Sequence, residues 1–97
     1  IITPTEVINL VAQYYGVGVQ QIKGERRTKT VVWPRQVLMY ILRNDLKLPF
    51  EEVGRLIGGR DHTTVMHADG KVGQIMKDDP MVYNQVVEIK KKLLRNS

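Results

Sequence analysis

The side chains best suited to do chemistry follow one another at residues 60–64, in the order Arg-Asp-His-Thr-Thr. The pair Gly58-Gly59 precedes them, and an apolar rhythm begins directly after them at Val65. A carboxylate, an imidazole and two hydroxyls supply both hydrogen-bond donors and acceptors in a small volume. Such a set is suited to reading hydrogen-bonding edges, as the bases present them in a DNA groove.

The same residues are poorly suited to catalysis or to metal binding. His62 and His67 are five positions apart, about 140° around a helix, so they do not converge on a metal as an i, i+4 pair would. Ser97 is the only serine and stands at the end of the sequence, and there is no cysteine. No phosphate-binding loop of the GxxxxGK[ST] type is present. We therefore expect neither an enzyme nor a metal site.

The net charge of +5 belongs to one part of the chain. Residues 23–60 contain nine basic and four acidic side chains, and the charges of the remainder cancel. A positive field confined to one segment favours a polyanionic partner, of which nucleic acid is the commonest. A basic face that only keeps the protein in solution explains the charge equally well.

The elements that must position these residues show helical periodicity. In the first of them, Thr3-Pro4 provides a cap and a first helical residue, apolar side chains recur at three and four positions, and Gly16 ends the helix. A helical turn is predicted at residues 17–23, and helices are predicted at about 34–46, 50–57, 61–76 and from 80 onward. Pro34 is expected to open the second long helix. No segment alternates as a strand does.

The pattern predicts an all-α fold, a compact Trp-repressor-like bundle of about six helices in a single domain spanning residues 1–97. No apolar run approaches the roughly 18 residues that a membrane span needs. We therefore expect a soluble protein without a transmembrane segment.

A helix-turn-helix is predicted at about residues 50–76, because a short helix, a Gly-bearing turn and a second helix follow one another there. The second helix of that motif enters the major groove and touches bases with its N-terminal residues. Thr63 offers a methyl group to thymine, Asp61 can accept from cytosine N4, and His62 can donate to purine or thymine acceptors. Two alternatives stay open: Asp61 caps the helix, reads a base or does both, and His62 is simply a surface residue.

A basic loop is predicted at residues 24–33, where charge is dense and apolar periodicity is absent. Basic arms beside a helix-turn-helix commonly enter the adjacent minor groove, so Arg26, Arg27 and Lys29 are candidates for that role. Arg35, Gln36 and Arg43, on the following helix, would contact phosphates. The alternative is that these charges are only solvated.

Two stretches carry a resemblance to a known family. "GRLIGGRDHTTVMHADGK" at 54–71 resembles the signature of the C-terminal DNA-binding domain of the bacterial replication initiator DnaA, and "RRTKTVVWPRQ" at 26–36 is similar to its basic loop. The resemblance spans essentially the whole chain. The departures from the family pattern are Glu51, Ile57, Asp69 and Gly70.

The resemblance implies a six-helix bundle that binds A·T-rich DnaA boxes of the type TTATNCACA at the replication origin. It implies that Asp61, His62 and Thr63 read bases in the major groove and that Arg27 enters the minor groove. It also implies a set of residues that hold the phosphate backbone or its edge: Arg35, Gln36, Arg43, Arg60, Thr64 and Lys71. Asp69 and Gly70 replace longer or basic residues and are expected to weaken phosphate binding.

The same resemblance implies double-stranded DNA as the partner and no cofactor, because the ATP-binding module of the family is absent from this sequence. We expect an isolated domain that is monomeric, contacts other protomers only through domains absent here, and is cytoplasmic and associated with the nucleoid. The alternative function is a helix-turn-helix module for protein interaction or regulation that docks an acidic partner. A weaker alternative is binding to an anionic membrane surface.

Overall fold

The apolar periodicity of the chain produces six α-helices in the computed structural model, which describes residues 1–96. The helices are α1 (Pro4–Tyr15), α2 (Val19–Lys23), α3 (Lys29–Asn44), α4 (Phe50–Leu56), α5 (His62–Asp78) and α6 (Pro80–Asn96). No residue from 1 to 96 lies in a strand. The predicted all-α class and the predicted number of helices are confirmed.

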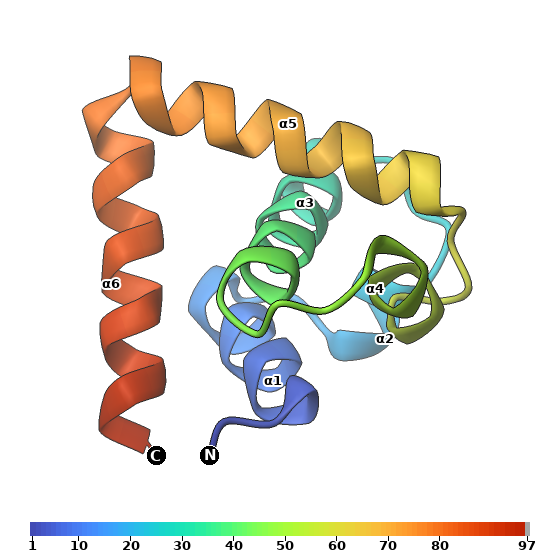
Figure 1. Ribbon diagram of the computed structural model, residues 1–97, viewed down its shortest axis with the longest axis horizontal. Coiled ribbons are helices and arrows are strands. Elements are labelled where there is room, and N and C mark those ends of the chain that lie inside the picture. Colours follow the sequence, from blue (N-terminus) through green and yellow to red (C-terminus); the bar gives the residue numbers. More distant parts are fainter. Residues whose placement is uncertain (97) are drawn as a thin grey trace.

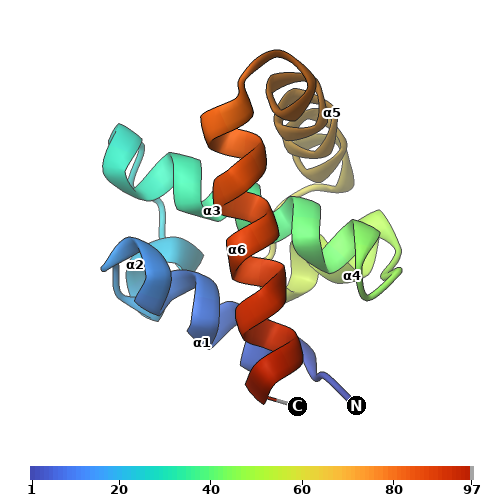
Figure 2. The same ribbon diagram turned by 90° about the vertical axis from the view of Figure 1, so that its left-hand side faces the viewer.

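Helix α3 occupies the centre and packs against α1, α2, α4 and α5. Figure 1 shows α5 lying across one end of α3 and turning sharply into α6, which runs down the side of the molecule. Figure 2, in which α6 faces the viewer, shows its full length from the corner with α5 to the end of the molecule where α1 begins. The start of α1 and the end of α6 thus lie together, at the edge of the molecule opposite α5.

One connected core holds these helices together, and every helix contributes to it. Its largest fully buried side chains include Ile22 of α2, Leu38 of α3, Ile57 beyond α4 and Ile89 of α6. Burying a side chain of this size stabilises the fold by about 1.5–3 kcal/mol. The core, more than helix propensity, therefore fixes where α5 lies.

Helix α1 begins and ends as the sequence predicts. The Thr3 side chain accepts a hydrogen bond of 3.2 Å from the backbone N–H of Glu6, and Pro4 is the first helical residue. Gly16 ends the helix in the left-handed conformation, with φ of 68°. Local signals were sufficient here because the cap and the terminator both act within one helical turn.

Helix α3 begins five residues earlier than predicted, so two predictions were wrong: Pro34 does not open this helix, and the basic loop does not extend to residue 33. The Thr28 carbonyl accepts the N–H groups of Val31 and Val32, which starts the helix at Lys29. Val31 is only 2% exposed, and Pro34 removes only one backbone donor from the helix. Burial of the first turns therefore outweighs the missing bond, and the basic loop comprises residues 24–28.

The turn between α4 and α5 is drawn tightly against the body of the protein. The N–H of Arg60 donates to the Gly54 carbonyl at 2.8 Å. Gly58 has φ of +74°, and a Cβ there would lie 2.1 Å from the carbonyl oxygen of Lys23. This close approach places α4, the turn and α5 in the helix-turn-helix order predicted at about 50–76, and α5 continues two residues further, to Asp78.

No helix of residues 1–96 combines the length and the apolarity needed to cross a membrane.

Candidate nucleic-acid interface

The first turn of α5 presents its polar side chains to solvent. Asp61 occupies the N-cap position, and its carbonyl accepts the N–H groups of Thr64 and Val65. The side chain of Val65 is fully buried and anchors the turn in the core, whereas residues 61–64 are all exposed. The helix therefore holds four adjacent polar residues rigidly at its exposed end.

Three of these side chains form one network. The Thr63 hydroxyl donates to Oδ2 of Asp61 at 2.5 Å, and Nδ1 of His62 lies 3.0 Å from Oδ1 of the same carboxylate. The Thr63 hydrogen bond is the main reason that the pKa of Asp61 is lowered, and the neighbouring His62 adds to it. The carboxylate is thus kept ionised and able to accept further hydrogen bonds.

The carboxylate of Asp61 does not cap the helix. It makes no side-chain capping hydrogen bond, although the residue has the extended backbone of an N-cap. Of the predicted alternatives, side-chain capping is therefore not what the structure contains. The carboxylate is oriented by His62 and Thr63 instead, on the exposed surface.

The basic loop faces the start of α5 across a cleft. This cleft has a volume of about 610 Å³, and the side chains that border it include Arg27 and Thr64. Arg27 is exposed, and the only acidic residue along the cleft is Glu25. Arg27 and Thr64, the latter in the first turn of α5, thus border one cationic cleft. A DNA contact by either residue stays a prediction.

A second cleft of about 250 Å³ lies between α3 and α5. Gln36, Thr64, His67 and Lys71 are among the residues that border it. The Oε1 atom of Gln36 is buried there and has no hydrogen-bond partner within residues 1–96. Arg35 and Arg60 also border it, so five of the six predicted backbone-contacting residues are gathered along one groove beside the helix.

Arg35 borders both clefts, but its guanidinium is engaged within the protein. It is only 6% exposed, and every nitrogen of its guanidinium donates to a backbone carbonyl. The acceptors are Gln21, Ile22, Gly24 and Arg26, at 2.7–3.2 Å. Burial is the main cause of its lowered pKa, and the nearby charge of Arg60 acts in the same direction. The Arg35 guanidinium is thus largely used inside the protein, and a phosphate contact by it stays a prediction.

Arg60 and Arg43 are also engaged within the protein. The Nη1 group of Arg60 donates to the carbonyls of Ile57 and Lys23 at 2.7 and 3.2 Å, and its Nη2 group donates to Gly24. Burial lowers the pKa of Arg60, and Glu25 partly opposes this. Arg43 donates to the Leu48 carbonyl at 3.1 Å and lies 4.4 Å above the ring of Phe50. A phosphate contact by Arg43 stays a prediction.

Sequence reasoning missed the internal contacts of Arg35 and Arg60 and the role of Asp69. The Asn44 amide donates to Oδ1 of Asp69 at 2.6 Å, which links α3 to α5. Asp69 is therefore part of the contact between two helices. Gly70 beside it is exposed and has open space around its Cα. The one available signal was the five-residue helix α2, whose terminal carbonyls need donors from elsewhere.

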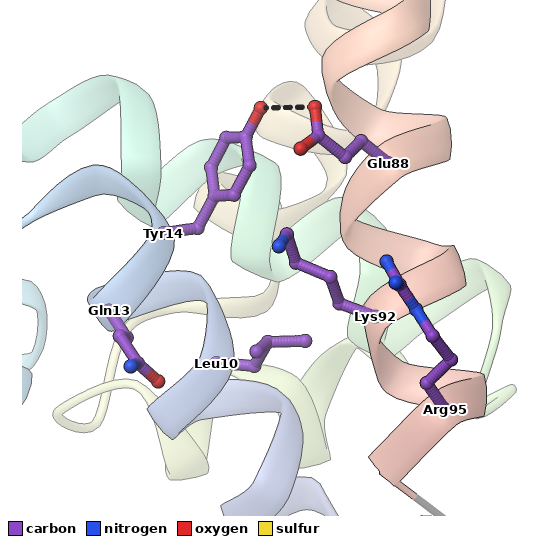
Figure 3. Close-up of a pocket in the computed structure, with 6 residues that line it drawn as sticks. All are labelled: Leu10, Gln13, Tyr14, Glu88, Lys92 and Arg95. Atoms are coloured by element: carbon purple, nitrogen blue, oxygen red, sulfur yellow. Dashed lines mark hydrogen bonds between the residues drawn. The ribbon is translucent and has the colours of Figure 1, made fainter.

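Another cleft, of about 550 Å³, lies between α1 and α6 (Figure 3). Lys92 and Arg95 extend along it from α6, and the Tyr14 hydroxyl donates to Oε2 of Glu88 at 3.2 Å. Burial raises the pKa of Tyr14, and the charge of Glu88 raises it further. Figure 1 places this part of α6 away from the start of α5, so the basic residues of α6 do not join the predicted interface. Within residues 1–96, no three His, Asp or Glu residues gather to hold a metal ion.

Comparison with known proteins identifies similar sequences. A family model described as "Bacterial dnaA protein helix-turn-helix" matches residues 4–72. Proteins titled "Chromosomal replication initiator protein DnaA" from Leifsonia xyli subsp. xyli and from Clavibacter sepedonicus are each 38% identical over 96 residues, which is 99% of this chain and 20% of each relative. The corresponding protein of Herpetosiphon aurantiacus is 38% identical over 92 residues, or 95% of the chain and 20% of the relative. The chain thus spans about a fifth of the length of these relatives.

Proposed function

The chain belongs to the bacterial DnaA helix-turn-helix family, and from this we propose that it binds double-stranded DNA in a sequence-specific way at DnaA boxes, in the initiation of chromosomal replication. One observation carries the proposal most directly. The network of Asp61, His62 and Thr63 is exposed at the start of α5. The next residue, Thr64, borders a cationic cleft that Arg27 also borders.

The proposed major-groove contacts come from this network. Thr63 donates its proton to Asp61, so its oxygen is left to accept and its methyl group to contact a thymine. The ionised carboxylate accepts from the exocyclic amine of cytosine, and Nε2 of His62 reaches a base acceptor. Because the three side chains already hold one another, little of their conformational freedom is lost on binding.

The proposed minor-groove contact is made by Arg27. A protein that reads adjacent minor and major grooves must straddle the sugar-phosphate strand between them. The cleft of about 610 Å³ that Arg27 and Thr64 both border offers a place for that strand. A narrow A·T-rich minor groove has a strongly negative potential, which favours an inserted guanidinium. Thr64, Gln36 and Lys71 would hold phosphates and fix the register of the protein on the duplex.

This proposal includes no catalytic step and no bound nucleotide. The initiator activity of the full-length relatives would require the parts of those proteins that this chain does not cover. A protein with the proposed role acts on the chromosome, so we propose a cytoplasmic location at the nucleoid.

The proposal is tested by fluorescence-anisotropy titration of two labelled duplexes at several salt concentrations, one containing TTATCCACA and one with the same bases scrambled. We expect a preference for the box of at least about tenfold, equivalent to about 1.4 kcal/mol, and an affinity that falls as salt rises. Equal affinity for both duplexes would leave only a general DNA-binding role. No binding to either would remove the proposal.

Lys71→Ala is expected to weaken binding to both duplexes alike and to lower the slope of log K against log salt by about 1, because one phosphate contact and its released counterion are lost. Lys92→Ala is the matched control, since Lys92 borders the cleft between α1 and α6. The slope of this control should match that of the unsubstituted protein. An unaltered slope for Lys71→Ala would contradict its phosphate role.

Docking of an acidic partner protein is the second candidate function. The cleft between α1 and α6 favours it, because Lys92 and Arg95 both border that cleft and Glu88 is the only acidic residue along it. Failure of the protein to bind either duplex, together with loss of partner binding in Lys92→Ala, would move this function to first place.

A further inference from the structure

The end of helix α2 is held by two arginines from distant parts of the chain. A helix leaves its last four carbonyls without partners inside the helix, and α2 has only five residues in all. Arg35 donates to the carbonyls of Gln21 and Ile22, and Arg60 donates to that of Lys23. Both arginines donate to the carbonyl of Gly24. These two side chains, which we call the arginine clasp, therefore complete α2 and fix the first residue of the basic loop.

Arg60 connects the two halves of the candidate interface. It belongs to the turn that leads into α5, and it binds that turn through the Ile57 carbonyl at 2.7 Å. The same guanidinium spans 36 and 37 positions of sequence to reach Gly24 and Lys23. One planar group thus joins the turn of the helix-turn-helix to the start of the segment that carries Arg27.

This arrangement places two like charges close together at a partly buried site. Removing two guanidinium groups from water is unfavourable, and their mutual repulsion adds to the cost. The pKa values of both arginines are lowered by burial, in keeping with that cost. The carbonyl oxygens offset it, since each accepts from a charged donor and such bonds are stronger than neutral ones. The two arginines of the clasp are therefore held in place by these carbonyl groups and are not simply solvated side chains.

We propose that Arg60 is a positioning residue that acts through Arg27: it fixes the basic loop relative to the first turn of α5, so that the minor-groove and major-groove contacts are made together. This inference rests on the proposed function and deepens it. Arg35 supports the same loop from the other side, because its Nη1 group donates to the Arg26 carbonyl at 2.8 Å.

A direct phosphate contact by Arg60 predicts a different outcome on substitution. A phosphate is satisfied by a point charge, so lysine at this position would preserve much of the affinity. Holding three carbonyls requires the forked donors of a guanidinium, which lysine lacks. Arg60→Lys therefore separates the two roles while it keeps the charge of the protein unchanged.

The test is a double-mutant cycle between Arg60→Lys and Arg27→Ala on the TTATCCACA duplex. Arg27→Ala should weaken binding about tenfold in the otherwise unchanged protein and less than about twofold in the Arg60→Lys background, because the loop is no longer held in place. Arg55→Lys is the matched control, since within residues 1–96 the Arg55 side chain bonds only to Glu52, on the surface of α4. In that background Arg27→Ala should retain its full effect. A full effect of Arg27→Ala in the Arg60→Lys background would overturn the inference.

A second measurement does not depend on whether Arg60→Lys folds. The chain has no cysteine, so spin labels can be attached only at Arg26→Cys and Met66→Cys. Both positions are exposed. In the absence of DNA, a narrow distribution of distances between the labels is expected, and a broad one would overturn the inference. If the unsubstituted protein does not prefer the box, the proposed function fails, whereas an intact preference with an undiminished Arg27 effect removes only the role of Arg60.

Discussion

Gly58→Ala should lower the free energy of unfolding by about 3 kcal/mol, the largest loss of stability that we expect from removing a single glycine in the helix-turn-helix. Two effects act together at this position. The backbone has φ of +74°, which strains any residue with a side chain, and the added Cβ would lie 2.1 Å from the Lys23 carbonyl oxygen. To relieve that contact, the turn must move away from the end of α2, which also disturbs the carbonyl that Arg60 binds.

Gly59→Ala provides the matched control for this prediction. Gly59 has nearly the same backbone angle, with φ of +76°, but an added Cβ would meet nothing within 4 Å. Only the cost of the left-handed conformation remains, about 1 kcal/mol. Urea denaturation followed by circular dichroism measures both values. Equal losses for the two variants would show that close approach to α2 contributes nothing.

His62→Ala and Arg27→Ala should each weaken binding to the cognate box by about 1–3 kcal/mol and reduce discrimination against a scrambled duplex. His62→Ala removes a donor at the exposed end of α5, and Arg27→Ala removes the charge proposed to enter the minor groove. The measurement is a titration of both variants against both duplexes at a fixed salt concentration. Unchanged discrimination in both variants would remove the proposed base-reading roles.

Two control variants show whether the losses in His62→Ala and Arg27→Ala come from the proposed contacts. Lys92→Ala removes one positive charge from the cleft between α1 and α6, so it controls for the change in net charge that Arg27→Ala causes. His62→Gln keeps a hydrogen-bond donor and should therefore lose less discrimination than His62→Ala. A loss of equal size for Gln and Ala would indicate that the imidazole acts through its shape and not as a donor.

Local signals predicted much of the fold, because each acts over a few residues. Thr3, Pro4 and Gly16 set the bounds of α1 within single turns. Pro34 misled the prediction because the propensity of proline to begin helices is a local statistic, whereas burial of Val31 depends on side chains far away in sequence. The start of α3 could not be predicted without knowing the core.

In the candidate site, too, features set by local signals could be predicted and features set by long-range contacts could not. Exposure of residues 61–64 follows from the periodicity of α5, and the structure agrees with it. The hydrogen bonds of Arg35 could not be predicted, because their acceptors are backbone carbonyls 9–14 positions away. Every residue type has such a carbonyl, so the sequence does not indicate which ones accept. The role of the Asp61 side chain stayed open for a related reason: Thr63 and His62 compete with the helix for the same carboxylate.

The two chain ends lie on the side of the molecule opposite α5. The start of α1 and the end of α6 lie together at one edge, and α5 lies at the opposite edge (Figure 1). A tether attached through Ile1 therefore leaves the molecule on the side remote from α5 and does not pass between the protein and a duplex. Protein immobilised on a sensor surface through its N-terminus therefore keeps α5 outward, as a domain carried on a flexible stalk would.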